Sequence, residues 1–317
     1  MSLSVALLAI ATFLGCSQSS VQKKAGPVPN FISSTDEHFV ARGKYLAEHV
    51  AACTHCHSTP NWEVFAGPTI PGTEGQGGRS WPLADGNMGM VFAGNLTPSG
   101  VGEWTDGELL RAITSGVHKD GYALFPIMPY QAYGTMTESD AKAIVSYLRT
   151  LEPRESRTYP RRLSVFMAKK ASSSVAAPAW GVPPGLNDIL ARGKYLADIA
   201  GCAGCHTPEG EEGAADENLF AGGVEFKMAM GTAISANITP AEGRGLGYWD
   251  EEEFLKKISA YRTDEALRVE AGPSDPNTVM PWFAYAGMTD DDLKAIWAYL
   301  MAQKPNDAEV VEAWRPH

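Results

Sequence analysis

This 317-residue chain lacks three features, each of which would define a class of protein. No apolar run approaches the ~20 residues of a membrane-spanning helix, so the chain is not a polytopic membrane protein. Basic residues are too few for nucleic-acid binding, because phosphate contacts need a basic face and the net charge is −11. The compositional signs of disorder are also missing, since 44% of the residues are hydrophobic and 20% are charged. The length suits two ordinary domains.

Alternation of apolar and polar residues with a period of two, the pattern of strands, is scarce as well. Helical spacing predicts a first helix over 36–53 and a short one near 106–115, while Thr137 and Thr289 each precede a final helix as capping residues. The 58–105 stretch has almost no periodic signal, and a compact domain rarely holds such a loop without a functional reason. We therefore expect a mostly α fold whose long ordered loops pack on a large cofactor.

The second half of the chain repeats the first half in the same order. Residues 41–47 recur at 191–197, and Met-Pro-aromatic at 128–130 recurs at 280–282. A repeat this long predicts a duplicated domain and not a solenoid. The predicted division is a signal peptide (1–15), a flexible tether (16–35), a first domain (36–153), a linker (154–187), a second domain (188–303) and a C-terminal tail (304–317).

Four of the five cysteines lie in two Cys-x-x-Cys-His motifs. This motif is the attachment signature of c-type haem, in which two thiols bond to the haem vinyl groups and the histidine becomes an iron ligand. A thioredoxin-like dithiol would need a βαβ pattern that is missing here, and zinc would need a further ligand. The sequence therefore predicts two covalently attached haem c groups, on Cys53, Cys56 and His57 and on Cys202, Cys205 and His206.

Each copy offers two methionines as the second iron ligand. Met128 and Met280 each precede a proline, which favours an extended backbone that can present a sulfur to the iron. Met136 and Met288 each precede a helix cap, where an apolar residue usually packs. We predict Met128 and Met280 as ligands, with thioether coordination raising the reduction potential. His118, in a turn, is the alternative ligand in the first copy.

The N-terminal residues have the features of an export signal. Residues 3–15 are apolar and uncharged, too short to span a membrane and long enough for a signal core. They end at Gly15 and Cys16, after which the chain turns polar, which resembles a bacterial lipoprotein signal cut before the cysteine. We expect an exported protein on the periplasmic side of a bacterial membrane, anchored by lipid on Cys16. An ordinary secretory signal with an incidental cysteine is the alternative.

Taken together, these residues resemble a dihaem c-type cytochrome built from two class I cytochrome c domains. More narrowly, residues 192–196, 202–208, 237–240 and 280–289 are similar to the domains of cytochrome c subunits of membrane-bound alcohol and gluconate dehydrogenases. The resemblance covers about residues 36–303. It implies that the first and last helices of each copy cross near a glycine and an aromatic residue, for which Gly43 with Tyr147 and Gly193 with Tyr299 are the candidates. Those subunits usually carry three haems, whereas this chain has two motifs.

Several other side chains are expected near the haems. His49 is expected at the surface of the first helix, and His55 at the surface or at the haem edge. The side chains expected to pack around the haems or to bond a propionate are Trp104, Trp249, Tyr130, Trp282, Asn95 and Asn237.

The predicted function is electron transfer between periplasmic or membrane redox partners through two His/Met-ligated haems, and not catalysis. The partner would be a dehydrogenase, an oxidase or another cytochrome. The alternative from another class is a dihaem peroxidase, which needs one haem with an open coordination site. Methionines at matching positions in both copies argue against that alternative.

Overall fold

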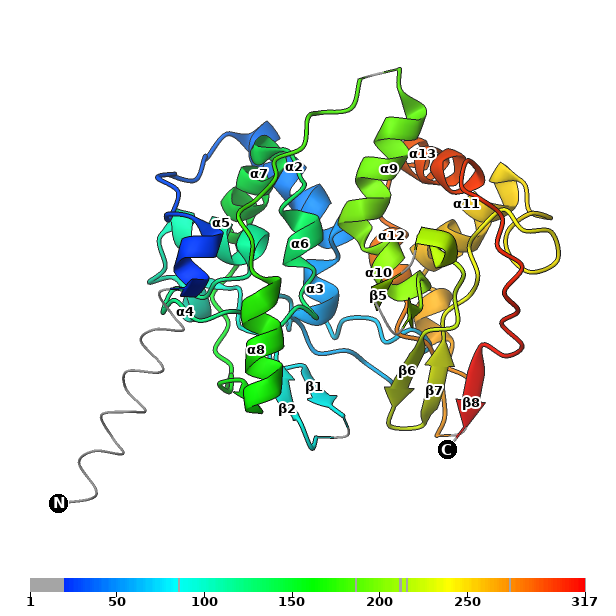
Figure 1. Cartoon of the computed structure of the whole chain (residues 1–317), viewed down its shortest axis with the longest axis horizontal. Helices are drawn as coiled ribbons and strands as arrows, with labels where there is room; N and C mark the ends of the chain where they lie inside the picture. Colours follow the sequence, from blue (N-terminus) through cyan, green and yellow to red (C-terminus); the bar gives the residue numbers. More distant parts are fainter. Residues whose placement is uncertain are drawn as a thin grey trace. The chain divides into compact units, whose positions relative to one another are not determined.

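The computed structural model describes residues 20–316, apart from residues 85, 186, 211, 212, 215 and 274. The expected signal peptide and Cys16 therefore lie outside the described residues. Contacts divide the chain into two compact units: unit 1 holds residues up to 44 together with 75–182, and unit 2 holds 45–74 together with the residues from 183 onward. Segment 45–74, which carries the first motif, thus groups with unit 2. Figure 1 traces the chain by colour.

Unit 1 is a set of helices with one small antiparallel sheet of order β1-β2-β3. Its elements are α2 (Glu37–Tyr45, whose last residue belongs to unit 2), β1 (Ser80–Leu83), β2 (Gly89–Phe92), α4 (Pro98–Val101), α5 (Asp106–Ser115), α6 (Tyr130–Tyr133), α7 (Glu138–Leu148), β3 (Arg162–Leu163) and α8 (Val165–Ser174). The helix expected near 106–115 is α5. Strand β3 and helix α8 lie in the segment that the sequence predicted to be a linker.

Unit 2 has a similar make-up, with a three-stranded antiparallel sheet β6-β7-β8 and a two-stranded pair β4-β5. Its helical elements are η1 (Leu46–Val50), α3 (Cys53–Cys56), α9 (Ile189–Ala200), α10 (Cys202–His206), η2 (Asp216–Asn218), α11 (Glu251–Ser259), η3 (Ala260–Arg262), η4 (Ala266–Arg268), α12 (Trp282–Tyr285) and α13 (Asp290–Met301). Its strands are β4 (Glu209–Gly210), β5 (Gly213–Ala214), β6 (Glu225–Met228), β7 (Gly231–Ile234) and β8 (Trp314–Pro316).

The fold is therefore mixed rather than mostly α, because small sheets that were not expected accompany the helices. The strands are at most four residues long, so the alternation of exposed and half-buried residues in β1 and β6 is too short to stand out in the sequence. Strand β8 lies in the expected C-terminal tail and pairs with β7. Within the described residues, no helix combines the length and the apolarity needed to cross a membrane.

The first and last helices of each copy cross at a glycine. A Cβ on Gly43 would overlap the carbonyl oxygen of Ala143 on α7, and a Cβ on Gly193 would overlap that of Ala295 on α13. The resemblance is confirmed for Gly193, whose Cβ would lie 2.8 Å from the Cβ of Tyr299. For Gly43 the nearest atoms belong to the α7 backbone and not to Tyr147.

An arginine beside each glycine fixes the same helix pair. Arg42 donates two hydrogen bonds of 2.9 and 2.8 Å to Asp140, and Arg192 Nε donates one of 2.7 Å to Asp292. Each aspartate is the third residue of its helix and donates its backbone N–H to the capping threonine, Thr137 in one case and Thr289 in the other, as the sequence predicted. The last helix is thus capped and tied to the first helix at one point in both copies.

Part of the expected tether is built into the core of unit 1. Residues 20–25 are helical, and Val21 is only 2% exposed. Val21 and Ala25 pack with Val117 and with Ala171 and Val175 at the end of α8. The segment carries too few apolar residues to show periodicity, which is why its composition alone suggested a tether.

In unit 2, the segment after the first motif is hydrogen-bonded to a long loop of the second copy. Phe65 donates its backbone N–H to Val269 O at 2.8 Å, and Ala271 donates to Glu63 O at 2.8 Å. Asn277 reaches the same segment, accepting from Ala66 N at 2.8 Å. These bonds give residues 63–66, which carry no periodic signal, a defined backbone conformation.

Candidate haem sites

Each Cys-x-x-Cys-His motif forms one turn of helix, α3 or α10, entered through a left-handed residue. That residue is Ala52 (φ 49°, ψ 41°) before α3 and Gly201 (φ 71°, ψ 25°) before α10. A left-handed residue ends the preceding helix sharply, so the two thiols follow directly after the turn. Glycine adopts this conformation without strain, whereas alanine does not.

Replacing Gly201 by alanine should therefore destabilise the protein by about 1–2 kcal/mol. A Cβ at Gly201 would meet no atom within 4 Å, so the cost comes from the backbone conformation alone. Gly204→Ala is the matched control, because its Cβ also has open space and its φ is not positive. There we expect a gain of up to ~1 kcal/mol from helix propensity. Denaturant unfolding of the haem-loaded variants measures both changes, and equal effects would contradict the backbone argument.

The four thiols of the motifs are unbridged. Burial, together with Cys56, raises the pKa of the Cys53 thiol to about 12, and burial together with Cys205 does the same for Cys202. Burial and the charge of Cys56 also raise the pKa of Cys205.

The ring of His206 is oriented by the backbone. It is buried, and its Nδ1 lies 2.7 Å from Ala236 O, which assigns the proton to Nδ1 and the lone pair to Nε2. Burial lowers the pKa of His206 and so favours the neutral ring that a metal needs. A carbonyl on the second ring nitrogen is the usual partner of a metal-ligating histidine. His57 follows α3 as its C-terminal cap and donates its backbone N–H to Cys53 O at 2.9 Å.

The two Met-Pro segments have nearly the same backbone. Pro129 has φ −80° and ψ 50°, and Pro281 has φ −80° and ψ 58°. In each case the residue after the proline donates to the methionine carbonyl at 2.8 Å and starts a one-turn helix, α6 or α12. Met128 and Met280 are half-buried. The extended segment predicted from the proline is thus a turn that projects from a short helix.

The other two methionines lie in the protein core. Met136 is 0% exposed and Met288 is 3% exposed, as expected for residues that pack beneath a helix cap. Side chains so enclosed by protein cannot also reach a cofactor without displacing their neighbours.

In unit 2, the methionine turn is joined to the second motif. The hydroxyl of Tyr285, at the end of α12, donates to Ala200 O at 2.6 Å, two residues before Cys202. Met280 itself donates its N–H to the hydroxyl of Thr278 at 3.1 Å. His206 and Met280 both belong to unit 2, whereas His57 belongs to unit 2 and Met128 to unit 1.

Two histidines are engaged by protein groups. His118 stacks on Tyr122 with ring centroids 4.2 Å apart, meets Trp104 edge-on, and accepts from Asp120 N at 3.2 Å. This ring is built into an aromatic cluster of unit 1. The expectation of an exposed His49 is wrong, because its ring is half-buried against Gly287 with Nδ1 3.2 Å from Ala284 O.

The aromatic residues expected near the haems have different surroundings. Trp282 stacks on Tyr261 at 5.1 Å, and Phe65 stacks on the same tyrosine at 6.4 Å. Tyr130 is buried in unit 1, whereas Trp249 is exposed.

Asn95 and Asn237, which were expected to pack around a haem or to bond a propionate, are engaged by backbone groups and by neighbouring hydroxyls. Asn237 Oδ1 accepts from Thr239 N and Oγ1 at 2.9 and 2.7 Å, and its Nδ2 donates to the carbonyls of Asn306 and Ala308. Asn95 makes the equivalent bonds, with Nδ2 donating to Arg154 O at 2.8 Å. Each asparagine thus clamps the chain that leaves the last helix. The recurrence of Asn-x-Thr-Pro in both copies was the only sequence signal for this clamp.

Asn237→Ala should destabilise the protein by about 3 kcal/mol, because buried backbone groups lose their partners. Asn237→Asp keeps the acceptor but turns a carboxylate oxygen toward the carbonyls of Asn306 and Ala308, so it should cost at least as much. Thermal unfolding of the haem-loaded variants is the measurement. An unchanged haem spectrum with lowered stability would confirm a structural role, and a changed spectrum with normal stability would contradict it.

A comparison with protein families matches the cytochrome c family to residues 190–304. The chain contains a cytochrome c domain. This domain spans α9, the second motif with His206, the Met280 turn and α13. Haem c is therefore supported as its cofactor.

Curated relatives cover most of the chain. The cytochrome subunit of fructose dehydrogenase from Gluconobacter japonicus is 29% identical over 87% of this chain and 55% of its own length. The cytochrome c subunit of alcohol dehydrogenase (quinone) from Gluconacetobacter polyoxogenes is 29% identical over 85% and 57%. A "diheme cytochrome c-type" protein of Cereibacter sphaeroides is 26% identical over 78% and 80%.

The chain therefore spans a little over half the length of the two dehydrogenase subunits. Its homology to cytochrome c subunits of dehydrogenases confirms the resemblance at that level. These homologues are electron-transfer subunits rather than catalytic enzymes, as expected for this chain.

Proposed function

We propose that this protein is a dihaem c-type cytochrome that carries electrons between redox proteins through two His/Met-ligated haems. In the second copy, Cys202 and Cys205 attach the haem, and His206 and Met280 ligate its iron. The orientation of His206 by Ala236 O, inside the matched cytochrome c domain, carries this proposal.

A second haem on Cys53 and Cys56, with His57 and Met128 as iron ligands, is supported by local structure. Four structural features occur at equivalent places in both copies: the glycine at the helix crossing, the Arg–Asp bond, the asparagine clamp and the Met-Pro turn. In copy two these features belong to the matched cytochrome c domain, so their presence in copy one favours a second such domain. A relative named as a dihaem cytochrome points the same way.

Haem iron supplies one-electron cycling between the ferrous and ferric states. The chain's own residues fix the ligands. Ala236 O holds the His206 ring in one tautomer, and Tyr285 ties the methionine turn to the segment that precedes Cys202. Preorganised ligands of this kind keep the geometry unchanged when the charge on the site changes, which favours fast electron transfer over substrate binding.

We further propose a periplasmic protein that is anchored by lipid on Cys16 and serves a dehydrogenase. The names of two relatives support a dehydrogenase as the partner. No reported relative is named as a peroxidase, and the equivalent methionine turns in both copies give neither haem an open coordination site.

Optical and electron paramagnetic resonance spectra of the purified holoprotein, with a haem count per chain, test the proposal. We expect two haems per chain, both low-spin and both with sulfur-to-iron charge transfer. A high-spin haem that takes up exogenous ligands would contradict it and would make peroxide turnover the next assay.

A further inference from the structure

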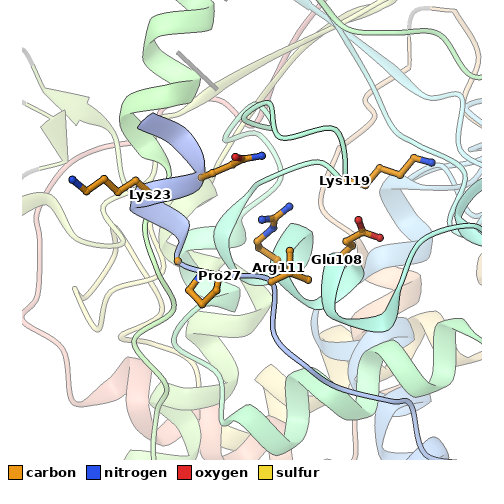
Figure 2. Close-up of a pocket in the computed structure, with 8 residues that line it drawn as sticks. Lys23, Pro27, Glu108, Arg111 and Lys119 are labelled. Atoms are coloured by element: carbon orange, nitrogen blue, oxygen red, sulfur yellow. The ribbon is translucent and has the colours of Figure 1, made fainter. Parts of the chain in front are cut away.

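A surface pocket of about 520 Å³ lies in unit 1, away from the residues discussed so far. One wall is the N-terminal segment that contains Gln22, Lys23 and Pro27, and the other is formed by α5 and the turn at Lys119. Figure 2 shows the Arg111 side chain rising from α5 into the middle of the pocket, with Glu108 beside it. A volume of this size is ordinary for a small-molecule site.

Arg111 is the unusual residue of this pocket. It is only 5% exposed, and within the described part of the chain its Nε has no hydrogen-bond partner. Burial lowers the pKa of this guanidinium, and the charge of Glu108 only partly opposes that shift. A buried guanidinium N–H without an acceptor is unfavourable. An anion in the pocket would supply acceptors and a neutralising charge for Arg111.

The surrounding charges favour an anion as well. Lys119 Nζ lies 3.9 Å from the exposed carboxylate of Glu103, outside the pocket lining. Within the lining, Lys23, Lys119 and Arg111 stand against the single carboxylate of Glu108. That carboxylate is directed into the helix cap, where it accepts from Thr105 N at 2.8 Å and from Thr105 Oγ1 at 3.0 Å. The lining thus has a formal charge of +2, which suits a phosphate group. The planar guanidinium of arginine can donate two hydrogen bonds to the phosphate oxygens, and the flexible lysine side chain adds a positive charge.

The pocket walls are held in place by packing. Val21 and Ala25 are buried in the core of unit 1, which positions Gln22 and Lys23 between them. Lys24 donates to Ser172 O of α8 at 3.2 Å. On the other wall, every residue of α5 from Leu109 to Ser115 is buried. The packing of unit 1 therefore holds both walls of the pocket in a defined conformation.

We propose that this pocket binds the phosphate group of a larger molecule, with the Arg111 guanidinium as the main contact and Lys23 and Lys119 as supporting cations. Inorganic phosphate would fill only part of 520 Å³, and Pro27 and Val28 offer apolar surface to the remainder of the molecule. A soluble organophosphate and a phospholipid headgroup share this chemistry. The proposal does not depend on the haem function, because none of these residues lies in a haem motif.

Isothermal titration of the full-length holoprotein at low ionic strength tests the proposal. The probes are glycerol 3-phosphate and dihexanoylphosphatidylglycerol below its micelle concentration. We expect one binding site per chain and at least about tenfold weaker binding in Arg111→Met, in line with the loss of charge-assisted bonds. Lys119→Gln should weaken binding several-fold, and it keeps the proposal testable if the Arg111 variant fails to fold.

The control is Lys304→Gln, which removes one exposed positive charge in unit 2 and should leave the affinity unchanged. Tighter binding of the lipid probe would identify a headgroup site, and tighter binding of glycerol 3-phosphate a soluble ligand. The proposal is overturned if neither probe binds, if Arg111→Met and Lys119→Gln bind like the wild type, or if citrate binds more tightly than both phosphates.

Discussion

Met280→Ala should remove the sulfur-to-iron charge-transfer band of one of two haems, halving its intensity in the oxidised holoprotein. The reduction potential of the same haem should fall, because thioether ligation is what raises it. Met280 is the candidate because its turn is fixed from both sides, by Thr278 at its N–H and by Tyr285 through Ala200. Near-infrared absorbance and a potentiometric titration measure the two effects.

Met288→Ala is the matched control, since it truncates a methionine eight residues further along the chain. Met288 is buried in the core, so its loss should cost about 2–5 kcal/mol of stability with the charge-transfer band intact. If the band disappears in Met288→Ala and persists in Met280→Ala, the ligand assignment is reversed.

Gly193→Ala should destabilise the protein by about 3 kcal/mol, despite the ~1 kcal/mol that alanine gains in helix propensity. The added methyl group overlaps the carbonyl oxygen of Ala295, a backbone atom that cannot rotate away. Helices α9 and α13 must then separate, and the Arg192–Asp292 ion pair lies next to the point of contact. Unfolding of the holoprotein in denaturant, followed by circular dichroism, gives the change.

Gly185→Ala serves as the control for this substitution. Gly185 is exposed, and a Cβ there would lie 3.9 Å from Asp188, an ordinary contact. We expect a change within ~0.5 kcal/mol. If Gly185→Ala and Gly193→Ala cost the same, the close crossing of α9 and α13 does not limit stability.

The parts of the fold that were predictable from the sequence are those set by local chemistry. Threonine three residues before aspartate predicted the caps of α7 and α13, and the caps are present. Proline after Met128 and Met280 predicted a non-helical backbone at both sites, and both have it. In each case the decisive residues are within a few positions of one another, so one stretch of sequence contains the whole signal.

The parts that were missed depend on pairings between distant segments. Phe65 and Val269 are about 200 residues apart in the sequence and are joined by a backbone hydrogen bond, which no side-chain pattern indicates. The asparagine clamps were missed for the same reason, because the amide nitrogens donate to groups far along the chain, after the last helix. Most of these acceptors are backbone carbonyls, which leave no signal in the sequence.

The buried position of Val21 would limit the distance between this protein and a membrane if Cys16 carried lipid. Only four residues lie between Cys16 and Val21, which is a span of at most about 17 Å for a fully extended chain. With lipid on Cys16, the cytochrome would remain close to the membrane and would not diffuse between distant redox partners. Val21 would then stay within that distance of the bilayer surface, so the anchored cytochrome would exchange electrons only with partners at the same membrane.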